Sequence, residues 1–163
     1  MGTRDSGDGS NEMLVSEYMS TSLHTLDPSG TVEEAAKFFL RYSISVAPVV
    51  DKGGKLLGVL ADDDLMVEET QLHIPTIFTA LGEVAAWPPA VRRFERELKR
   101  YLASTVGEAM TTKVITTHPS DTIEEAATLM HEHHLRTLPV VDGEKVVGML
   151  GRRDLLRALV RRS

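Results

Sequence analysis

Apolar residues recur at intervals of three and four in two well separated stretches of the chain, as expected where one face of a helix is buried. The first stretch runs from Val32 to Leu40 and the second from Ile123 to Met130. Each follows a threonine that precedes a glutamate by three residues, and this capping-box spacing satisfies free backbone donors at a helix start. The pattern therefore predicts two amphipathic helices, beginning after Thr31 and Thr122.

Runs that are apolar on both faces predict strands that are covered on both sides. They come as two pairs, each separated by a short turn-forming segment, which predicts two hairpins: 47–50 with 56–60, and 138–141 with 146–150. Shorter extended segments that end at Pro-Ser turns are 23–26 and 114–117, and short helical leads before them are 15–19 and 106–110. A further helix is expected after Asp64 and after Asp154.

These elements are two copies of one unit. Most of the characteristic residues between Val15 and Asp51 recur 91 positions later, and those between Lys55 and Leu65 recur 90 positions later. Each copy has the order strand, helix, strand, strand, helix, so we predict an α/β (α+β) fold of two repeats, packed about a pseudo-two-fold axis into one disc-like module. We assign the chain as follows: disordered lead 1–12, first repeat 13–66, helical insert or linker 67–104, second repeat 105–163.

The insert has no counterpart in the repeat. Val91, Phe94 and Leu98 form an apolar stripe opposite strongly charged positions, which predicts a helix. A helical linker packed on the repeats is the interpretation we favour, and a docking element for a partner is the alternative.

The amino-acid composition excludes several classes of function. A net charge of −6 argues against a nucleic-acid partner, and the absence of cysteine excludes thiolate chemistry and disulfides. No apolar run approaches the roughly 20 residues that cross a bilayer, so we expect a cytoplasmic protein without a membrane partner.

Catalytic motifs are missing from the chain. It contains no nucleophile elbow, no Gly-rich phosphate loop and no paired-histidine metal motif, so we predict that it is not an enzyme. His131, His133 and His134 are interpreted as a solvated helix end rather than a zinc site, and no metal site is predicted.

The ordered motifs resemble a known family. Met-Thr, Thr-x-x-Pro, the capped Glu-Glu-Ala-Ala helix, Leu-Pro-Val-Val-Asp and a glycine six residues before Asp-Leu together are similar to the cystathionine-β-synthase-type (CBS) domain. The duplicated set resembles the tandem pair called a Bateman module. The resemblance covers 15–66 and 106–159.

The resemblance implies that adenosine-containing ligands bind in clefts between the repeats, where the aspartate that closes the glycine motif accepts hydrogen bonds from ribose hydroxyls. A pure helix N-cap is the alternative role for Asp64 and Asp154. The first implied cleft combines Gly58, Asp64, Val114, Ile115, Thr116, Leu135 and Arg136. The second combines Gly148, Arg152, Asp154, Leu23, His24, Thr25, Ile44 and Ser45.

The two implied clefts differ at the position expected to face phosphates. Arg136 offers a fork of donors and Ser45 one hydroxyl, so we expect the first cleft to bind nucleotide more strongly, unless Arg136 only forms a surface ion pair with Glu132. The family's Ser/Thr before the aspartate is Ala61 in one repeat and Gly151 in the other, and losing that hydrogen bond costs about tenfold in affinity at most.

The resemblance further implies a regulatory module that binds AMP, ADP, ATP or S-adenosylmethionine, with or without Mg²⁺, and signals occupancy to an effector protein. It implies a homodimer and requires no other cofactor. The main alternative is a constitutive dimerisation scaffold with degenerate clefts. A redox- or DNA-linked regulator that uses the insert as its contact surface is a third.

Overall fold

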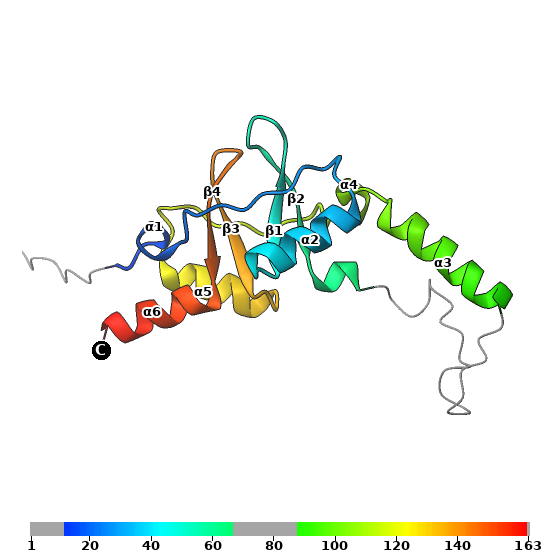
Figure 1. Cartoon of the computed structure of the whole chain (residues 1–163). Coiled ribbons are helices and arrows are strands. Elements are labelled where there is room, and N and C mark those ends of the chain that lie inside the picture. The colour runs from blue at the N-terminus through cyan, green and yellow to red at the C-terminus, as the bar shows by residue number, and fades with distance from the viewer. Residues whose placement is uncertain (1–11, 67–87, 163) are drawn as a thin grey trace, which may run out of the picture. The chain divides into compact units, whose positions relative to one another are not determined.

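The computed structural model describes residues 12–66 and 88–162. The predicted disordered segment 1–12, except Glu12, and residues 67–87 of the insert therefore lie outside the described residues. The elements in chain order are α1 (Val15–Tyr18), α2 (Val32–Tyr42), β1 (Val46–Val50), β2 (Leu56–Ala61), the 3₁₀ turn η1 (Asp63–Leu65), α3 (Pro88–Leu102), α4 (Val106–Ala109), α5 (Ile123–Glu132), β3 (Thr137–Asp142), β4 (Lys145–Gly151) and α6 (Arg152–Arg162) (Figure 1). This mixed helix and strand content, with small sheets, confirms the predicted fold class.

The described residues form two compact units, and each contains one hairpin. Of the described residues, unit 2 comprises 24–66, 88–114 and 144–146, and unit 1 comprises 12–23, 115–143 and 147–162. In unit 2, β1 and β2 pair antiparallel, with Val46 opposite Ala61 and Val49 opposite Gly58. The buried cluster of this unit is Leu26, Ala35, Phe39, Ala47, Val49, Leu60 and Val106.

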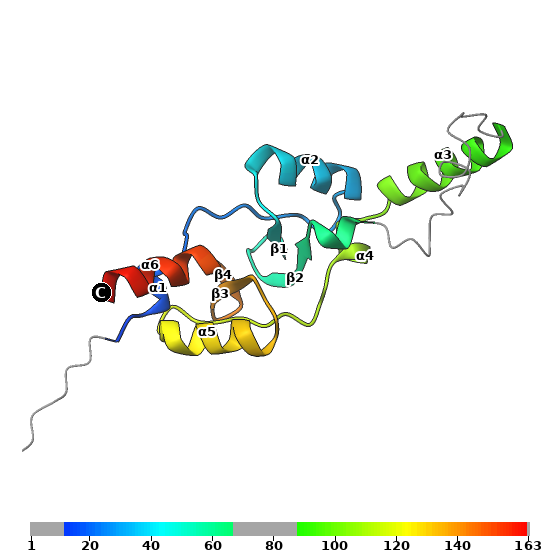
Figure 2. The same ribbon diagram turned by 90° about the horizontal axis from the view of Figure 1, so that it is seen from below.

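Unit 1 is built on the hairpin of β3 and β4. Helices α5 and α6 lie beside this hairpin in both views of the ribbon (Figures 1 and 2). Its buried cluster is Met13, Val15, Ile123, Ala126, Met130, Leu138, Val140, Leu150 and Ala158. The apolar faces predicted for α2 and α5 thus point into the core of their own units, except that Leu40, included in the face predicted for α2, is 81% exposed.

The short helical leads, 15–19 and 106–110, are exchanged: each packs in the unit formed mainly by the other repeat. Val15 of α1 is fully buried in unit 1, and Val106 of α4 is 1% exposed in the core of unit 2. Backbone hydrogen bonds fix both leads: Ser20 N–H donates to the Met149 carbonyl at 2.8 Å, and Val59 N–H donates to the Thr111 carbonyl at 3.0 Å. Unit 1, which holds most of the second repeat, therefore includes the helical lead of the first repeat. Unit 2, which holds most of the first repeat, includes the helical lead of the second.

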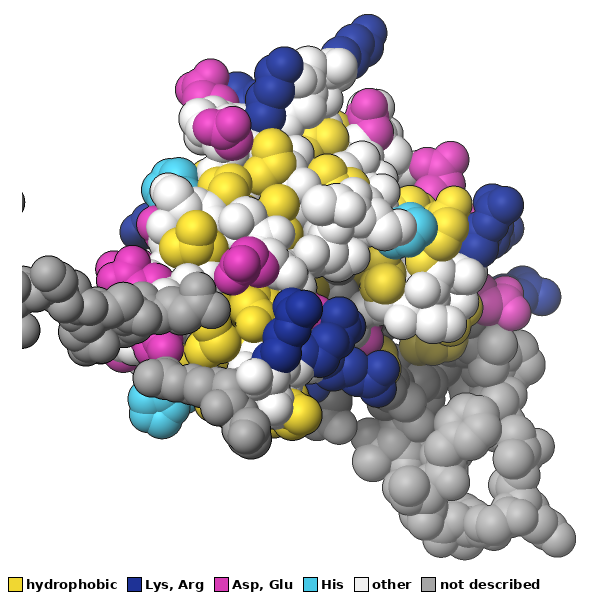
Figure 3. All heavy atoms as spheres, turned by 90° about the vertical axis from the view of Figure 1, so that its left-hand side faces the viewer, with side chains coloured by type: hydrophobic (Ala, Val, Ile, Leu, Met, Phe, Trp, Pro, Cys, Tyr) yellow, Lys and Arg dark blue, Asp and Glu magenta, His cyan; other side chains and the backbone are white. Residues whose placement is uncertain are grey.

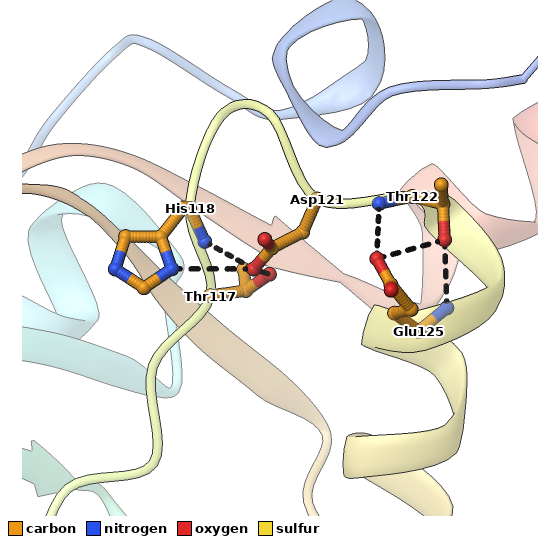
Figure 4. Close-up of polar contacts among 5 residues, drawn as sticks. All are labelled: Thr117, His118, Asp121, Thr122 and Glu125. Carbon is orange, nitrogen blue, oxygen red and sulfur yellow. Dashed lines mark hydrogen bonds and ion pairs between the residues drawn. The ribbon is translucent and has the colours of Figure 1, made fainter.

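The capping boxes are formed as predicted. In α2, Glu34 N–H donates to the Thr31 hydroxyl at 3.1 Å, and Thr31 N–H donates to the Glu34 carboxylate at 2.8 Å. The same reciprocal pair joins Thr122 and Glu125 at the start of α5, at 3.2 and 2.8 Å (Figure 4). A third capping box, at Thr105 in front of α4, was not predicted.

Two element predictions differ from the structure. The extended segments 23–26 and 114–117 form single parallel bridges, Leu26 with Val49 and Thr117 with Val140, because the Pro-Ser turn follows at once and leaves no further residue to pair. After Asp64 the chain forms only the 3₁₀ turn η1 within the described residues. The helix predicted in the insert is present as α3.

Candidate functional site

Asp64 lies in η1, directly after strand β2. Its Oδ2 accepts a hydrogen bond from Ala61 N–H at 2.8 Å, which closes a tight turn at the strand end. Asp62 N–H donates to the Ser45 carbonyl at 2.8 Å and fixes this turn against the residue before β1. The structure thus brings Asp64 and Ser45, which were predicted for different clefts, onto neighbouring segments of unit 2. The Asp64 side chain remains exposed.

Asp154 occupies the equivalent place in unit 1 but is far more enclosed. It is 7% exposed, its Oδ2 accepts from Gly151 N–H at 2.8 Å, and its Oδ1 lies 3.2 Å from Nη2 of Arg157. Arg152 N–H donates to the Arg136 carbonyl at 3.2 Å, so these two predicted site residues are neighbours in unit 1. Both of their side chains are exposed.

Neither aspartate is an N-cap, which corrects the alternative role considered from the sequence. Asp154 is the third residue of α6, and Asp64 is the second residue of η1, whose N-cap is Asp62. Each carboxylate reaches back to the N–H of the last strand residue, because a side chain in the first helical turn points toward the helix start.

Gly58 and Gly148 are explained by close packing. A Cβ added at Gly58 would lie 2.6 Å from Sδ of Met110 and 2.8 Å from the Thr111 carbonyl oxygen. At Gly148 the corresponding distances are 2.7 Å to Met19 and 3.0 Å to the Ser20 oxygen. Both glycines therefore admit the exchanged leads, and this role needs no ligand.

His24 of the second predicted cleft lies in an aromatic cluster. Its ring stacks on Tyr42 with centroids 4.1 Å apart and meets the edge of Phe38 at 6.2 Å. Sequence reasoning did not assign Phe38 and Tyr42 to the site, although their spacing of four on one helix face was a usable signal. Thr25 and Ile44 belong to the same unit, whereas Leu23 belongs to unit 1.

Ile115 and Thr116, predicted for the first cleft, precede a loop in unit 1 that is hydrogen-bonded around Asp121. The hydroxyl of the fully buried Thr117 donates to Oδ2 of Asp121 at 2.8 Å, as does His118 N–H at 2.8 Å, and Nδ1 of His118 lies 3.3 Å away (Figure 4). Burial of Asp121 opposes its ionisation, but these hydrogen bonds outweigh burial and lower its pKa. Asp121 thus fixes the backbone beside Thr116, a role not found from the sequence.

The remaining predicted residues are divided between the units. Val114 belongs to unit 2, and Leu135 belongs to unit 1, where it packs against the buried cluster. Each implied cleft draws residues from both units, so the pairing of its halves stays a prediction. A further contact to the Asp64 turn comes from the insert, since the Tyr101 hydroxyl donates to the Leu65 carbonyl at 3.1 Å.

The outer surface of α6 combines charge with apolar side chains. Leu156, Leu159 and Val160 are 60%, 59% and 76% exposed, and Arg157 beside them is 71% exposed. Figure 3 faces the C-terminal end of α6 and shows Lys and Arg side chains gathered next to hydrophobic ones. Within the described part of the chain, no helix has the length and apolar character needed to cross a membrane.

Comparison with known proteins gives consistent matches. A family model for the CBS domain matches residues 15–69 and 106–161. The uncharacterized protein MJ1426 of Methanocaldococcus jannaschii is 30% identical over 155 residues, 91% of this chain and 92% of that protein. Chloroplastic CBSX1 of Arabidopsis thaliana is 29% identical over 160 residues, 96% of this chain and 68% of that protein. The crystal structure of CBSX2 from the same plant in complex with AMP has a TM-score of 0.68 at 25% identity, covering 92% of this chain and 98% of that chain.

Proposed function

Because the chain belongs to the CBS domain family, we propose that it is a regulatory module without catalytic activity, which binds an adenosine-containing ligand between its repeats and signals occupancy to an effector protein. AMP, ADP, ATP and S-adenosylmethionine are the candidate ligands, with or without Mg²⁺, and the cytoplasm is the expected location. The AMP complex of CBSX2 supports an adenine nucleotide.

The observation that carries this proposal is the carboxylate of Asp64. One oxygen is held by Ala61 N–H, which fixes its direction, while the side chain is exposed. An ionised carboxylate offers about four acceptor sites, so it retains the capacity to accept both hydroxyls of a ribose. A fixed and accessible acceptor of this kind is the chemistry that sugar recognition requires.

Asp154 supports a weaker second site. Both of its oxygens already have partners, Gly151 N–H and the Arg157 guanidinium, and the group is buried. A ribose at Asp154 would have to share the carboxylate with these two partners, in a buried position, whereas Asp64 has one hydrogen-bond partner among the described residues and is exposed. We therefore propose that nucleotide binds first at Asp64. This ranking rests on the Asp64 carboxylate and not on Arg136, whose carbonyl accepts from Arg152 N–H beside the Asp154 turn.

Isothermal titration calorimetry with the four ligands, each with and without Mg²⁺, tests the proposal. We expect Asp64→Asn to weaken binding of the preferred ligand about tenfold or more, since it removes a charged acceptor while keeping the side-chain shape. Asp142→Asn, at the exposed end of β3, is the matched control and should bind as the wild type does. Full affinity in Asp64→Asn would refute the assignment.

A constitutive dimerisation scaffold is the second candidate, favoured by Ala61 and Gly151 where the family has Ser or Thr. We propose a homodimer in either case, with the exposed apolar residues of α6 in the interface because a two-fold contact matches one patch with itself. Val160→Glu is expected to give monomers in light scattering, whereas Lys52→Glu in the exposed β1–β2 turn is not. A dimer that binds none of the ligands would select the scaffold.

A further inference from the structure

Tyr101 connects the insert to the turn that carries Asp64. It lies near the end of α3, outside both repeats, and its hydroxyl donates to the Leu65 carbonyl at 3.1 Å. Partial burial raises the pKa of Tyr101, and the negative charge of Asp64 raises it further, so the phenol and the carboxylate influence one another electrostatically. The contact joins residues 36 positions apart in the sequence.

The backbone of Tyr101 is itself held in place. Its carbonyl accepts from both the N–H and the hydroxyl of Ser104, at 3.0 and 2.6 Å. The Ser104 carbonyl in turn accepts from Val32 N–H, the first residue of α2, at 2.8 Å. The end of α3 is thus fastened to the helix that packs in the core of unit 2.

The Asp64 turn is therefore held at both ends. On the strand side, Ala61 N–H binds the Asp64 carboxylate and Asp62 N–H binds the Ser45 carbonyl. On the far side, the Leu65 carbonyl accepts from Tyr101, the Leu65 N–H donates to the Asp62 carbonyl at 3.0 Å, and the Leu65 side chain packs against the buried cluster of unit 2. Releasing the Leu65 carbonyl removes one of the restraints on the backbone next to Asp64, while the Ala61 contact with its carboxylate remains.

We propose that Tyr101 is a positioning residue for Asp64, through which α3 and a ligand bound at Asp64 affect each other. The proposal rests on the proposed function and adds the route by which occupancy reaches the insert. Because coupling is reciprocal in free energy, a change in α3 alters ligand affinity, and ligand binding alters the surroundings of Tyr101.

Calorimetry of Tyr101→Phe with AMP tests the first direction. The substitution keeps the ring and removes the hydroxyl. The affinity of the binding event that Asp64→Asn weakens is expected to fall about three- to tenfold, the effect of one hydrogen bond. Tyr18→Phe on α1 of unit 1 is the matched control and should bind AMP as the wild type does. Circular dichroism confirms that both variants are folded.

Fluorine NMR of the wild-type protein labelled with fluorotyrosine tests the second direction without relying on the fold of a variant. The chain has three tyrosines, and single Tyr→Phe substitutions assign their signals. AMP is expected to shift the Tyr101 signal in the wild type, and Asp64→Asn should need about tenfold or more AMP for the same shift. A merely structural role of Tyr101 would leave this signal in place.

The outcomes separate the two proposals. If the wild type binds none of the four candidate ligands, the proposed function and the role of Tyr101 both fall. If it binds AMP and either the folded Tyr101→Phe variant keeps full affinity or the Tyr101 signal does not move, the role of Tyr101 alone is overturned. Reduced affinity together with a shifted signal supports it.

Discussion

Gly58 shows how a single residue can be required for packing rather than for a ligand. An added Cβ would come within 2.8 Å of the Thr111 carbonyl oxygen, and a backbone atom cannot move aside as a side chain can. We expect Gly58→Ala to lower the free energy of unfolding by about 1–3 kcal/mol, the usual cost of overpacking. Urea unfolding measures this loss.

Gly53→Ala is the control for that substitution. The nearest atom to its added Cβ is Oδ1 of Asp51 at 3.4 Å, an ordinary contact, so little change is expected. Equal stability of Gly58→Ala and Gly53→Ala would show that Met110 and Thr111 do not pack closely against Gly58 of β2 in solution.

Asp121 gives the protein a defined response to acid. Its pKa is lowered in the folded state, so its ionised form adds stability above the unfolded-state pKa of about 3.8, and this stability is lost as pH falls through the lower folded pKa. Asp121→Asn should therefore be less stable than the wild type at about pH 7, and the gap should shrink at about pH 2.5. Denaturant unfolding at both pH values measures the gap, and a constant gap contradicts the assignment.

Individual candidate site residues could be predicted where the same residue type recurs at the equivalent position of both repeats. Asp64 and Asp154 occupy matching positions, so the sequence alone singled them out, although not their backward hydrogen bonds. Tyr101 carries no such mark, because its contact with Leu65 spans 36 positions and arises only when the insert folds onto unit 2. Long-range contacts of this kind have no local pattern.

Among the elements, the start of α5 offers the cleanest test of local structure. The Thr122 hydroxyl accepts a hydrogen bond from Glu125 N–H and donates one to the Glu125 carboxylate, and its loss leaves the exposed N–H to water (Figure 4). We expect Thr122→Ala to lower the free energy of unfolding by about 1 kcal/mol. Thr128→Ala, which removes a hydroxyl from the same helix where it bonds only the Glu124 carbonyl, should have a smaller effect. Thermal unfolding distinguishes the two.

Helices with capping boxes and strands that flank short turns followed from the sequence, because the signals lie within a few residues of one another. The segments 23–26 and 114–117 have strand-like composition, but whether they pair depends on distant partners, Val49 and Val140. Val49 and Val140 lie in β1 and β3, and each of these strands already pairs with the other strand of its hairpin. Each segment therefore forms one bridge.

For the whole molecule, the exchange of leads makes each repeat incomplete on its own. A fragment of residues 105–163 lacks Met13 and Val15, which are 9% and 0% exposed in unit 1, and lacks α1, whose Val15 N–H donates to the Asp121 carbonyl at 2.9 Å. We expect it to show no cooperative thermal transition by circular dichroism, because one buried valine alone is worth about 1.5–3 kcal/mol.

Joining residues 12–23 through a flexible linker to residues 115–163 should restore a cooperative transition. The same chain with Val15→Asp is the control and should not regain one. Independent folding of the fragment without the lead would contradict the role of α1 in unit 1.

The exchange could not be read from the sequence. The two leads share the same pattern, Val15 and Met19 in one and Val106 and Met110 in the other, so each fits the hairpin glycine of either repeat equally well. Only the three-dimensional path of the chain decides which lead meets which glycine.

Exchanged leads also set the order in which a newly made chain can fold. The core of unit 2 is complete once Val106 has been synthesised, whereas the core of unit 1 joins Met13 and Val15 to Ala158. At about 5–20 residues per second, α1 waits on the order of ten seconds for its partners. During translation its apolar side chains are open to chaperones and to other nascent chains, so α1 is made before unit 2 but is buried after it.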